Sequence, residues 1–224
     1  MTEPLIRLHD VDFAYGPIAD SPVRLVLRGC NFRLDPGQRV ALVGPNGSGK
    51  TTLLHLIVGL LRPTSGRIEA FGRVRQQEAD FHEVRCRAGL LFQDSDDQLF
   101  CPTVVEDVAF GPLNLGQSRG DVHRIVAETF GRLGLSDYGN RVTHKLSGGE
   151  KRLVALATVL AMQPEVLLLD EPAAGLDLEA TDRLVEVLAE LPQAMVIVSH
   201  DRKFLERTTS GTICLPGIPR EDLG

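Results

Sequence analysis

The sequence predicts an α/β fold in which a mainly parallel sheet carries helices on both faces. Three apolar runs, at residues 40–43, 166–169 and 195–198, have the continuous pattern of strands that are buried on both sides, the first strand beginning at residue 39. Longer stretches with helical periodicity separate these runs, and this alternation is typical of parallel sheets. A chain of 224 residues that is 43% apolar and 24% charged has enough apolar side chains for one core of medium size.

Weaker patterns predict the other elements. Residues 5–13 and 23–34 alternate apolar and polar side chains, which predicts two antiparallel strands joined by a loop through Gly16-Pro17 and Ser21-Pro22. Further strands are expected at residues 67–70, 89–92 and 212–215, and helices at residues 51–59, 147–162 and 178–191. Residues 74–87 are polar, and their pattern is ambiguous.

The composition changes at about residue 94. Residues 104–110 and 122–133 have helical periodicity, and Gly and Pro interrupt the segment several times. We interpret residues 94–146 as a mostly helical insertion into a single domain. The core of that domain would comprise residues 1–93 and 147–215, followed by a short C-terminal tail at 216–224.

Bulk properties argue against several classes of function. A net charge of −6 gives no general attraction to nucleic acid or to anionic lipid. The N-terminus lacks the basic and apolar regions of a signal peptide, and the longest apolar run, at residues 53–61, is too short to span a bilayer. The four cysteines lie far apart without a C-x-x-C pair, so we expect reduced thiols in a soluble, cytosolic chain.

One segment between a predicted strand and a predicted helix indicates a specific chemistry. It has the pattern G-x-x-x-x-G-K-T and reads Gly44, Pro45, Asn46, Gly47, Ser48, Gly49, Lys50 and Thr51, with Thr52 next. Glycines allow backbone N–H groups to surround a polyphosphate, and the helix N-terminus adds partial positive charge. Lys50 would contact the β- and γ-phosphates, and the Thr51 hydroxyl would bind Mg²⁺. A glycine turn with a chance lysine explains eight positions in register less well, so we predict a phosphate-loop NTPase core.

Polar residues follow three other predicted strands. Asp170 and Glu171 come directly after residues 166–169, and in a phosphate-loop ATPase such an aspartate helps to hold Mg²⁺. Glu171 could then polarise the attacking water. Gln93 could reach the metal or the water, and His200 could bind the γ-phosphate. Taken alone, each is also explained as the polar start of a loop, and the phosphate loop favours the functional interpretation.

The predicted helix at residues 147–162 begins with an unusual pair of glycines. Ser147 and Glu150 have the spacing of a capping box, which explains these two residues structurally. Gly148 and Gly149 leave the helix N-terminus bare, which suits a second anion site. Since the phosphate loop already occupies one face of the nucleotide, we expect this site to serve the nucleotide of another molecule. Asp177 suits the N-cap of residues 178–191, and it could also face a dimer partner.

Together, and in their order along the chain, these motifs resemble those of the ATP-binding-cassette ATPases. The resemblance extends over nearly the whole chain. The resemblance covers the phosphate loop, a glutamine loop at Gln93, a signature at residues 146–150, the pair Asp170 and Glu171, a D-loop at residues 174–177, and a switch histidine at His200. It implies ATP and Mg²⁺ as cofactors, and it implies that Tyr15 stacks on adenine. One departure is Glu150, where the family usually has glutamine; we expect ATPase activity to survive it.

The resemblance also implies an assembly. Two copies would form a head-to-tail homodimer around two ATP molecules, with each phosphate loop facing Ser147 of the other copy. The segment 92–112 is similar to the energy-coupling-factor class of importers, in which this region contacts a transmembrane coupling subunit. Asp94, Asp96 and Asp97 beside Leu99 and Phe100 would suit a helix that carries arginines, although composition alone would assign a solvated loop.

Residues 150–157 look most like those of cobalt- and nickel-transport members. We therefore expect an ATPase subunit that powers cobalt or nickel import beneath coupling and substrate-binding membrane subunits, peripherally on the cytoplasmic face of the cell membrane. The alternatives are the ATPase of a vitamin or other transporter and a non-transport cassette that acts on nucleic acid. The acidic net charge and the lack of coiled-coil inserts or zinc-type cysteine pairs argue against the last, so no nucleic-acid partner is expected.

Overall fold

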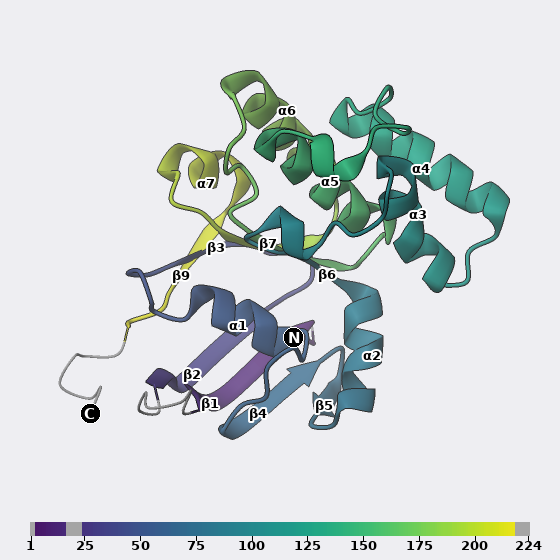
Figure 1. Ribbon diagram of the computed structural model, residues 1–224. Coiled ribbons are helices and arrows are strands. Elements are labelled where there is room, and N and C mark those ends of the chain that lie inside the picture. The colour runs from purple at the N-terminus through teal and green to yellow at the C-terminus, as the bar shows by residue number, and fades with distance from the viewer. Residues whose placement is uncertain (1–2, 17–23, 218–224) are drawn as a thin grey trace.

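A computed structural model describes residues 3–16 and 24–217 of the chain (Figure 1). Most of the loop that was expected between the first two strands, and most of the predicted C-terminal tail, lie outside these described residues. The predicted fold class is confirmed, with a parallel sheet, an antiparallel sheet and helices arranged around both.

The parallel sheet has five strands in the order β6-β7-β8-β3-β9. They are β6 (Ala88–Leu91), β7 (Val166–Asp170), β8 (Ala194–Val198), β3 (Arg39–Val43) and β9 (Gly211–Cys214). Every neighbouring pair runs parallel. Because the strands are parallel, the segments that follow β3, β7 and β8 all leave the sheet at the same edge.

Each central strand is buried on both faces. On β7, Leu167 and Leu169 belong to one hydrophobic core, and Val166 and Leu168 belong to the other. Helices α5 (Gly148–Ala161), α6 (Leu178–Glu190) and α7 (Arg202–Thr208) supply the first core. Helices α1 (Lys50–Ile57) and α2 (Glu78–Arg87) contribute to the second, and α1 lies between the two sheets (Figure 1). Burial on both faces explains the continuous apolar runs in the sequence.

The second sheet is antiparallel, in the order β2-β1-β4-β5. Its strands are β2 (Arg24–Leu34), β1 (Ile6–Tyr15), β4 (Ser65–Ala70) and β5 (Arg73–Arg75). The ambiguous residues 74–87 thus form the end of β5 and helix α2. Apolar periodicity does not mark this region because a charged side chain organises it: Arg75, only 5% exposed, donates hydrogen bonds to the carbonyl oxygens of Ala70 and Asp80.

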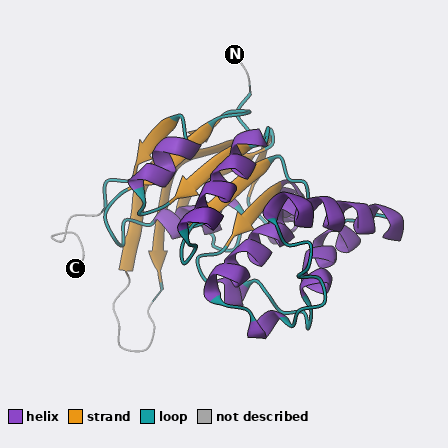
Figure 2. Cartoon of the chain, turned by 90° about the horizontal axis from the view of Figure 1, so that it is seen from above, coloured by secondary structure: helices purple, strands orange, loops and turns teal. Residues whose placement is uncertain are grey.

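The segment that follows β6 is mostly helical, as predicted. It contains 3₁₀ turns at Ser95–Asp97 and Thr143–Lys145 and the helices α3 (Val104–Asn114) and α4 (Arg119–Leu133). Figure 2 shows a group of helices extending to one side of the strands. Helix α5 packs against α3 and α4 and also against β6, so the division of the chain at residue 146 stays a prediction. In the described part of the chain, no helix has the length and apolar character that a bilayer span requires.

Helices α3 and α7 differ most from the sequence-based expectation. Helix α3 continues past Phe110 and includes Pro112, whereas the predicted helix ended before it. Helix α7 was not predicted, because it is only seven residues long and most of its residues are polar. Asp201 caps α7 through the backbone N–H groups of Lys203 and Phe204, and the buried Phe204 anchors it on the core.

Gly59 ends the helix that follows the phosphate loop. Its φ of 73° is in the left-handed region, which L-residues with a side chain rarely adopt. A Cβ atom at this position would also lie 2.2 Å from Cγ of Phe81 on α2. The glycine therefore serves both the turn of the chain and the close approach of α1 to α2.

We predict that Gly59→Ala lowers the free energy of unfolding more than Gly37→Ala, measured by urea denaturation. Gly37 has a φ of 69° but nothing within 4 Å of an added Cβ atom, so its substitution should cost only backbone strain, about 1–2 kcal/mol. Gly59→Ala should cost about 1–3 kcal/mol more, because Phe81 must move. Equal losses in the two variants would show that α2 does not restrict this turn.

Candidate functional site

A cavity of about 420 Å³ opens where the carboxyl ends of the parallel strands meet the ends of β1 and β2. Most of the predicted site residues line it: Tyr15, Asn46, Gly47, Gly49, Lys50, Thr51, Thr52, Gln93, Asp170, Glu171 and His200. Arg24, Val26 and Val198 line it as well. Residues that are up to 185 positions apart in the sequence (Tyr15 to His200) thus surround one space.

The predicted phosphate loop connects β3 to α1. Gly49 has a φ of 91°, and a Cβ atom there would lie 2.7 Å from Leu27 and 2.9 Å from Val26, so both its conformation and its surroundings require glycine. The N-terminus of α1 begins at Lys50, on the cavity wall. Its unpaired N–H groups and partial positive charge make this wall suitable for a phosphate.

Three loop residues lie behind the cavity and shape the loop. The Nζ atom of Lys50 donates hydrogen bonds to the carbonyl oxygens of Gly44 (2.9 Å) and Pro45 (3.1 Å). The backbone N–H of Ser48 donates to Pro45 across the turn (3.1 Å), and the Ser48 side chain is buried. Gly44, Pro45 and Ser48 therefore hold the loop curved, while their neighbours face the cavity.

Asp170 and Thr51 join the strand β7 to the phosphate loop. The Thr51 hydroxyl donates a hydrogen bond of 2.6 Å to Oδ2 of Asp170, which is only 2% exposed. Burial raises the pKa of Asp170, and the bond from Thr51 together with nearby positive charge partly opposes that rise. No group of three or more His, Cys, Asp or Glu side chains is arranged for a metal in the described residues. One carboxylate and one hydroxyl do fit Mg²⁺, which takes few protein ligands when phosphates and water supply the rest.

Glu171 has an unusual backbone and a carboxylate that faces the cavity. Its φ is 52°, which is uncommon for a residue with a side chain. Oε2 accepts hydrogen bonds from Ser199 Oγ and the His200 backbone N–H, both at 3.3 Å. Oε1 is buried without a hydrogen-bond partner among the described residues. An acceptor of this kind on a cavity wall is suited to bind a water molecule.

Gln93 and His200 line the cavity together with Glu171. Nε2 of His200 is 3.6 Å from Oε1 of Glu171, which is too long for a hydrogen bond, and its side chain is 69% exposed. Gln93 follows β6 and is exposed, with its side chain in the cavity lining. Both residues have the freedom to change partners when a ligand enters.

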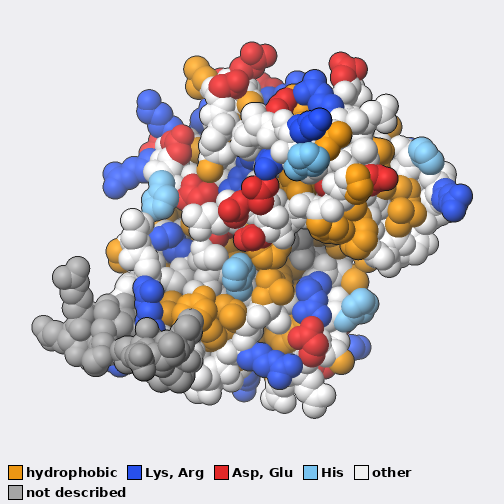
Figure 3. Space-filling view, in the orientation of Figure 1, with side chains coloured by type: hydrophobic (Ala, Val, Ile, Leu, Met, Phe, Trp, Pro, Cys, Tyr) orange, Lys and Arg blue, Asp and Glu red, His pale blue; other side chains and the backbone are white. Residues whose placement is uncertain are grey.

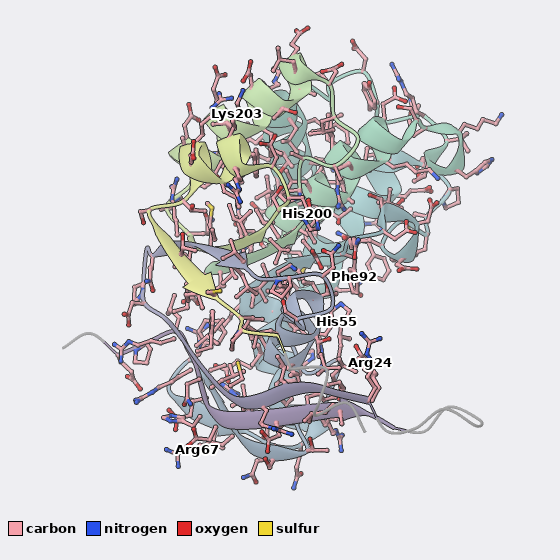
Figure 4. All side chains as sticks on the ribbon, turned by 90° about the vertical axis from the view of Figure 1, so that its left-hand side faces the viewer. Arg24, His55, Arg67, Phe92, His200 and Lys203 are labelled. Atoms are coloured by element: carbon pink, nitrogen blue, oxygen red, sulfur yellow. The ribbon has the colours of Figure 1, made fainter. Side chains whose placement is uncertain are left out.

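The ends of β1 and β2 form the opposite wall. The Tyr15 ring is 38% exposed and packs edge-to-face on Phe13, with ring centroids 4.9 Å apart. Its hydroxyl lies 3.3 Å from the hydroxyl of Thr52. Arg24 starts β2 and reaches Gly47, where an added Cβ atom would lie 3.3 Å from Nη2. In Figure 4, Arg24 and His200 lie at opposite ends of a row of labelled side chains that includes His55 and Phe92.

Sequence reasoning did not identify Arg24, Val26 or Val198. A single arginine or valine in a strand carries no local signal of a site. Arg24 and Val26 reach the cavity through the pairing of β1 with β2, and Val198 reaches it at the end of β8, beside Asp170. The basic side chain of Arg24 faces the same space as Lys50, so it adds positive charge where the phosphate loop is.

Ser147, Gly148, Gly149, Glu150 and Asp177 do not line this cavity. The capping box is present: Oε2 of Glu150 accepts from the Ser147 backbone N–H (2.8 Å), and Ser147 Oγ accepts from the Glu150 backbone N–H (3.3 Å). The exposed Ser147 and Gly148 leave the N-terminus of α5 open on a separate part of the surface.

The carboxylate of Glu150 forms an ion pair and hydrogen bonds with residues of the insertion. Its Oε1 accepts hydrogen bonds from the Tyr138 hydroxyl (2.9 Å) and from the guanidinium of Arg141 (2.8 Å), which also stacks on the Tyr138 ring. Hydrogen bonds from Ser147 and Tyr138 lower the pKa of Glu150, with a smaller contribution from the charge of Arg141. A neutral glutamine would make no ion pair with Arg141, so the insertion supplies a specific partner for the glutamate.

Asp177 caps helix α6 through the backbone N–H of Ala180 (2.8 Å), as predicted. Next to it, Leu178 is 76% exposed, which is unusual for a large apolar side chain. The same loop approaches the N-terminus of α5, since a Cβ atom at Gly149 would lie 2.8 Å from the carbonyl oxygen of Gly175. Residues 147–149 and 175–178 thus form a second exposed surface, here named the signature surface.

A groove of about 230 Å³ lies between the insertion and the core. We call it the insertion groove. The exposed apolar side chains of Leu60, Phe100 and Phe110 line it, together with the half-buried Phe92. Phe100 is 66% exposed and packs edge-to-face on Phe110, with ring centroids 4.8 Å apart. Figure 3 shows hydrophobic side chains exposed together between the part with α3 and the part with α2. The predicted acidic segment precedes Phe100, and one of its carboxylates, Asp96, pairs with Lys151 at 2.5 Å.

Comparisons with known proteins agree with this geometry. The ABC transporter family matches residues 27–174. The energy-coupling factor transporter ATP-binding protein EcfA of Methanothermobacter thermautotrophicus is 43% identical over 228 residues, covering 97% of this chain and 72% of that protein.

Two solved structures are also similar. One is cbiO1 of Clostridium perfringens, described as part of the ABC transporter complex cbiONQ, with a TM-score of 0.81 and 31% identity over 96% of this chain and 87% of that chain. The other is the ATP-binding cassette MJ0796 in a dimeric post-hydrolysis state with ADP and Pi, with a TM-score of 0.85 and 25% identity over 94% of each chain.

The family match spans well over half of the chain, and it includes the phosphate loop, the capping box of α5 and the pair Asp170 and Glu171. The ATP-binding-cassette ATPase that the motifs predict is thereby confirmed, and so is ATP as its ligand. The chain belongs to the ABC transporter family and is one of its ATP-binding, ATP-hydrolysing cassettes.

Proposed function

We propose that this cassette is the ATPase subunit of an energy-coupling-factor transporter that imports cobalt or nickel. The observation that carries the ATPase part is the single cavity in which the phosphate loop, Asp170 and Glu171 meet. The similarity to EcfA and to cbiO1 supports the transporter class.

In this proposal ATP enters the cavity with its base against Tyr15 and its phosphates along the loop. The exposed ring of Tyr15 offers a surface for stacking on adenine. Lys50 and the N-terminal N–H groups of α1 neutralise the phosphates. Thr51, Asp170 and Gln93 would hold Mg²⁺, which supplies charge neutralisation to the β- and γ-phosphates.

Glu171 acts as the general base in the proposed reaction. Its buried Oε1 lacks a partner among the described residues, and it is the acceptor that would orient a water molecule and take its proton. His200 would donate to the γ-phosphate and sense its loss, because its exposed ring lies 3.6 Å from the same carboxylate. Gln93 would contact the metal or the water.

The proposed working unit is a head-to-tail homodimer. Ser147, Gly148 and Gly149 lie outside the cavity on the signature surface. The Ser147 N–H donates to Glu150, and the N–H groups of Gly148 and Gly149 are open to the nucleotide of a second copy. Exposure of Leu178 beside Asp177 suits an apolar contact in the same interface. The dimeric state of MJ0796 supports this arrangement.

The proposed membrane partner docks in the insertion groove. Apolar Phe100 and Phe110 would receive the apolar face of a coupling helix, and the neighbouring Asp94, Asp96 and Asp97 would attract its arginines. This places the cassette peripherally on the cytoplasmic face of the cell membrane. Selection of the transported ion would belong to the substrate-binding membrane subunits, and the named complex of cbiO1 supports such partners.

Glu171→Gln should retain ATP binding but lower kcat by at least about 100-fold, since the amide cannot take a proton from water. In the presence of Mg²⁺ and ATP the variant should accumulate as a dimer, which light scattering after size exclusion would detect. Glu186→Gln, on the exposed face of α6, is the matched control and should hydrolyse ATP normally. Normal turnover in Glu171→Gln would remove its assignment as the base.

Charge reversal in the insertion groove should separate docking from hydrolysis. Asp96→Lys with Asp97→Lys should reduce co-purification with co-expressed membrane subunits and leave basal ATP hydrolysis unchanged, because neither carboxylate lines the ATP cavity. Glu186→Lys with Glu190→Lys makes the same change in net charge on α6, away from the groove, and should co-purify fully. Undiminished binding by the groove variant would contradict the docking assignment.

The transported ion is tested directly by uptake. Proteoliposomes that contain the complete complex should accumulate ⁵⁷Co or ⁶³Ni only with ATP, and the Glu171→Gln complex should not. Hydrolysis of ATP by wild type without uptake of either ion would retain the ATPase and exclude the metal-ion importer.

A further inference from the structure

We propose that Arg152 is a positioning residue for ATP hydrolysis, which ties helix α5 to the backbone of both Gln93 and Glu171. The inference rests on the proposed roles of these two residues. Arg152 lies in the second turn of α5, and its side chain does not line the ATP cavity. It would therefore act through its neighbours and never touch the nucleotide.

One guanidinium group joins two separate loops. Its Nη1 donates to the carbonyl oxygen of Phe92 (2.5 Å). Its Nη2 lies within hydrogen-bond distance of the carbonyl oxygens of Gln93 (3.1 Å), Asp170 (2.8 Å) and Glu171 (2.6 Å). The side chains of the last three residues line the ATP cavity, so Arg152 holds the backbone from which they project.

The surroundings of Arg152 show that its contacts are specific. The residue is only 2% exposed, and burial lowers the pKa of its guanidinium, while the carboxylates of Asp170, Glu171 and Asp94 oppose that effect. A buried arginine is costly unless its donors find acceptors. Here the guanidinium donates to backbone carbonyl groups. These carbonyls lie at the ends of β6 and β7, two neighbouring strands of the parallel sheet.

The backbone of Glu171 adopts a conformation that its hydrogen bonds must stabilise. Its φ of 52° is a strained conformation for a residue with a side chain, and it persists only where neighbouring groups enforce it. The backbone N–H of Glu171 donates to Val198 on β8 (2.9 Å), and its carbonyl accepts from Arg152. These two bonds fix the residue on both sides and thereby aim its carboxylate.

The same guanidinium reaches the insertion groove. Phe92, whose carbonyl accepts from Nη1, is part of the groove lining. A second contact reinforces the link: Gln98 accepts from the Phe92 N–H (3.2 Å) and donates to the carbonyl of Ala155 on α5 (2.8 Å). A displacement of α5 or of Phe92 would therefore shift Arg152 and, through it, the backbone of Glu171. Through these contacts Arg152, on α5, connects the insertion groove with the backbone of Glu171.

The test compares Arg152 with a second buried arginine that has no connection to the site. Arg75 is 5% exposed, and its guanidinium also donates to backbone carbonyls, those of Ala70 and Asp80. The variants are Arg152→Lys, Arg152→Met, Arg75→Lys and Arg75→Met in the full chain. Lysine keeps the charge but lacks the planar fork that serves several acceptors at once, so it should rescue Arg152 only in part.

Both pairs of variants should lower Tm, because each removes bonds of a buried arginine. Only the Arg152 variants should lower kcat, by about 10- to 100-fold, with an unchanged Kd for a fluorescent ATP analogue. Hydrogen exchange should accelerate at residues 92–98 and 170–175 in Arg152→Lys and not in Arg75→Lys. The lysine variants keep the test informative if a methionine variant fails to fold.

Two results would overturn the proposal: the same kcat in Arg152→Lys as in Arg75→Lys at matched loss of Tm, or a loss of nucleotide affinity that accounts for the whole loss of turnover. Wild-type hydrolysis serves as the reference that separates the two inferences. If wild type hydrolyses ATP and Glu171→Gln does not, an unchanged kcat in the Arg152 variants contradicts only the positioning role of Arg152. If Glu171→Gln retains turnover, the proposed roles on which this inference rests are wrong.

Discussion

The burial of β7 on both faces is the constraint on which the site depends. All five of its residues are buried, and its four apolar residues alternate between the two hydrophobic cores. Each large apolar side chain of such a strand contributes about 1.5–3 kcal/mol relative to an exposed position, so the strand cannot slip in register without exposing several of them. The end of β7 is therefore fixed in position. It places Asp170 and Glu171 beside the phosphate loop that follows β3.

The charges at this edge complement magnesium ATP. Lys50, Arg24 and the start of α1 make one wall positive, while Asp170 and Glu171 make another wall negative. A polyphosphate with its metal ion has the same division of charge, and enclosure strengthens each of these interactions relative to water. The bond between Thr51 and Asp170 keeps the two walls at a defined separation.

Helix α5 connects this cavity with the rest of the surface. Its N-terminus is open on the signature surface, its Glu150 binds the insertion through Tyr138 and Arg141, and its Arg152 holds the loops of the cavity. Because these contacts belong to successive turns of one rigid helix, the insertion and the hydrolytic edge are mechanically joined. The glutamate at position 150 fits this role, since its charge is shared with an arginine that the insertion supplies.

The sequence by itself determined the parts that local chemistry specifies. Continuous apolar runs identified β3, β7 and β8, the spacing of Gly47, Gly49 and Lys50 identified the phosphate loop, and the capping residues Ser147 and Asp177 identified the starts of α5 and α6. Each of these signals is contained within a few neighbouring residues. Local patterns alone therefore predict most of the residues that line the cavity.

Only the tertiary structure decided the parts that depend on contacts between distant segments. The pairing of β4 with β1, the arrival of Arg24 at the cavity and the buried bonds of Arg152 have no local pattern. Arg152 meets carbonyl groups that are 18 to 60 positions away in the chain, and every residue type carries the same backbone carbonyl. Side-chain bonds to backbone groups are set by where the chain folds, which is why periodicity and motif spacing do not reveal them.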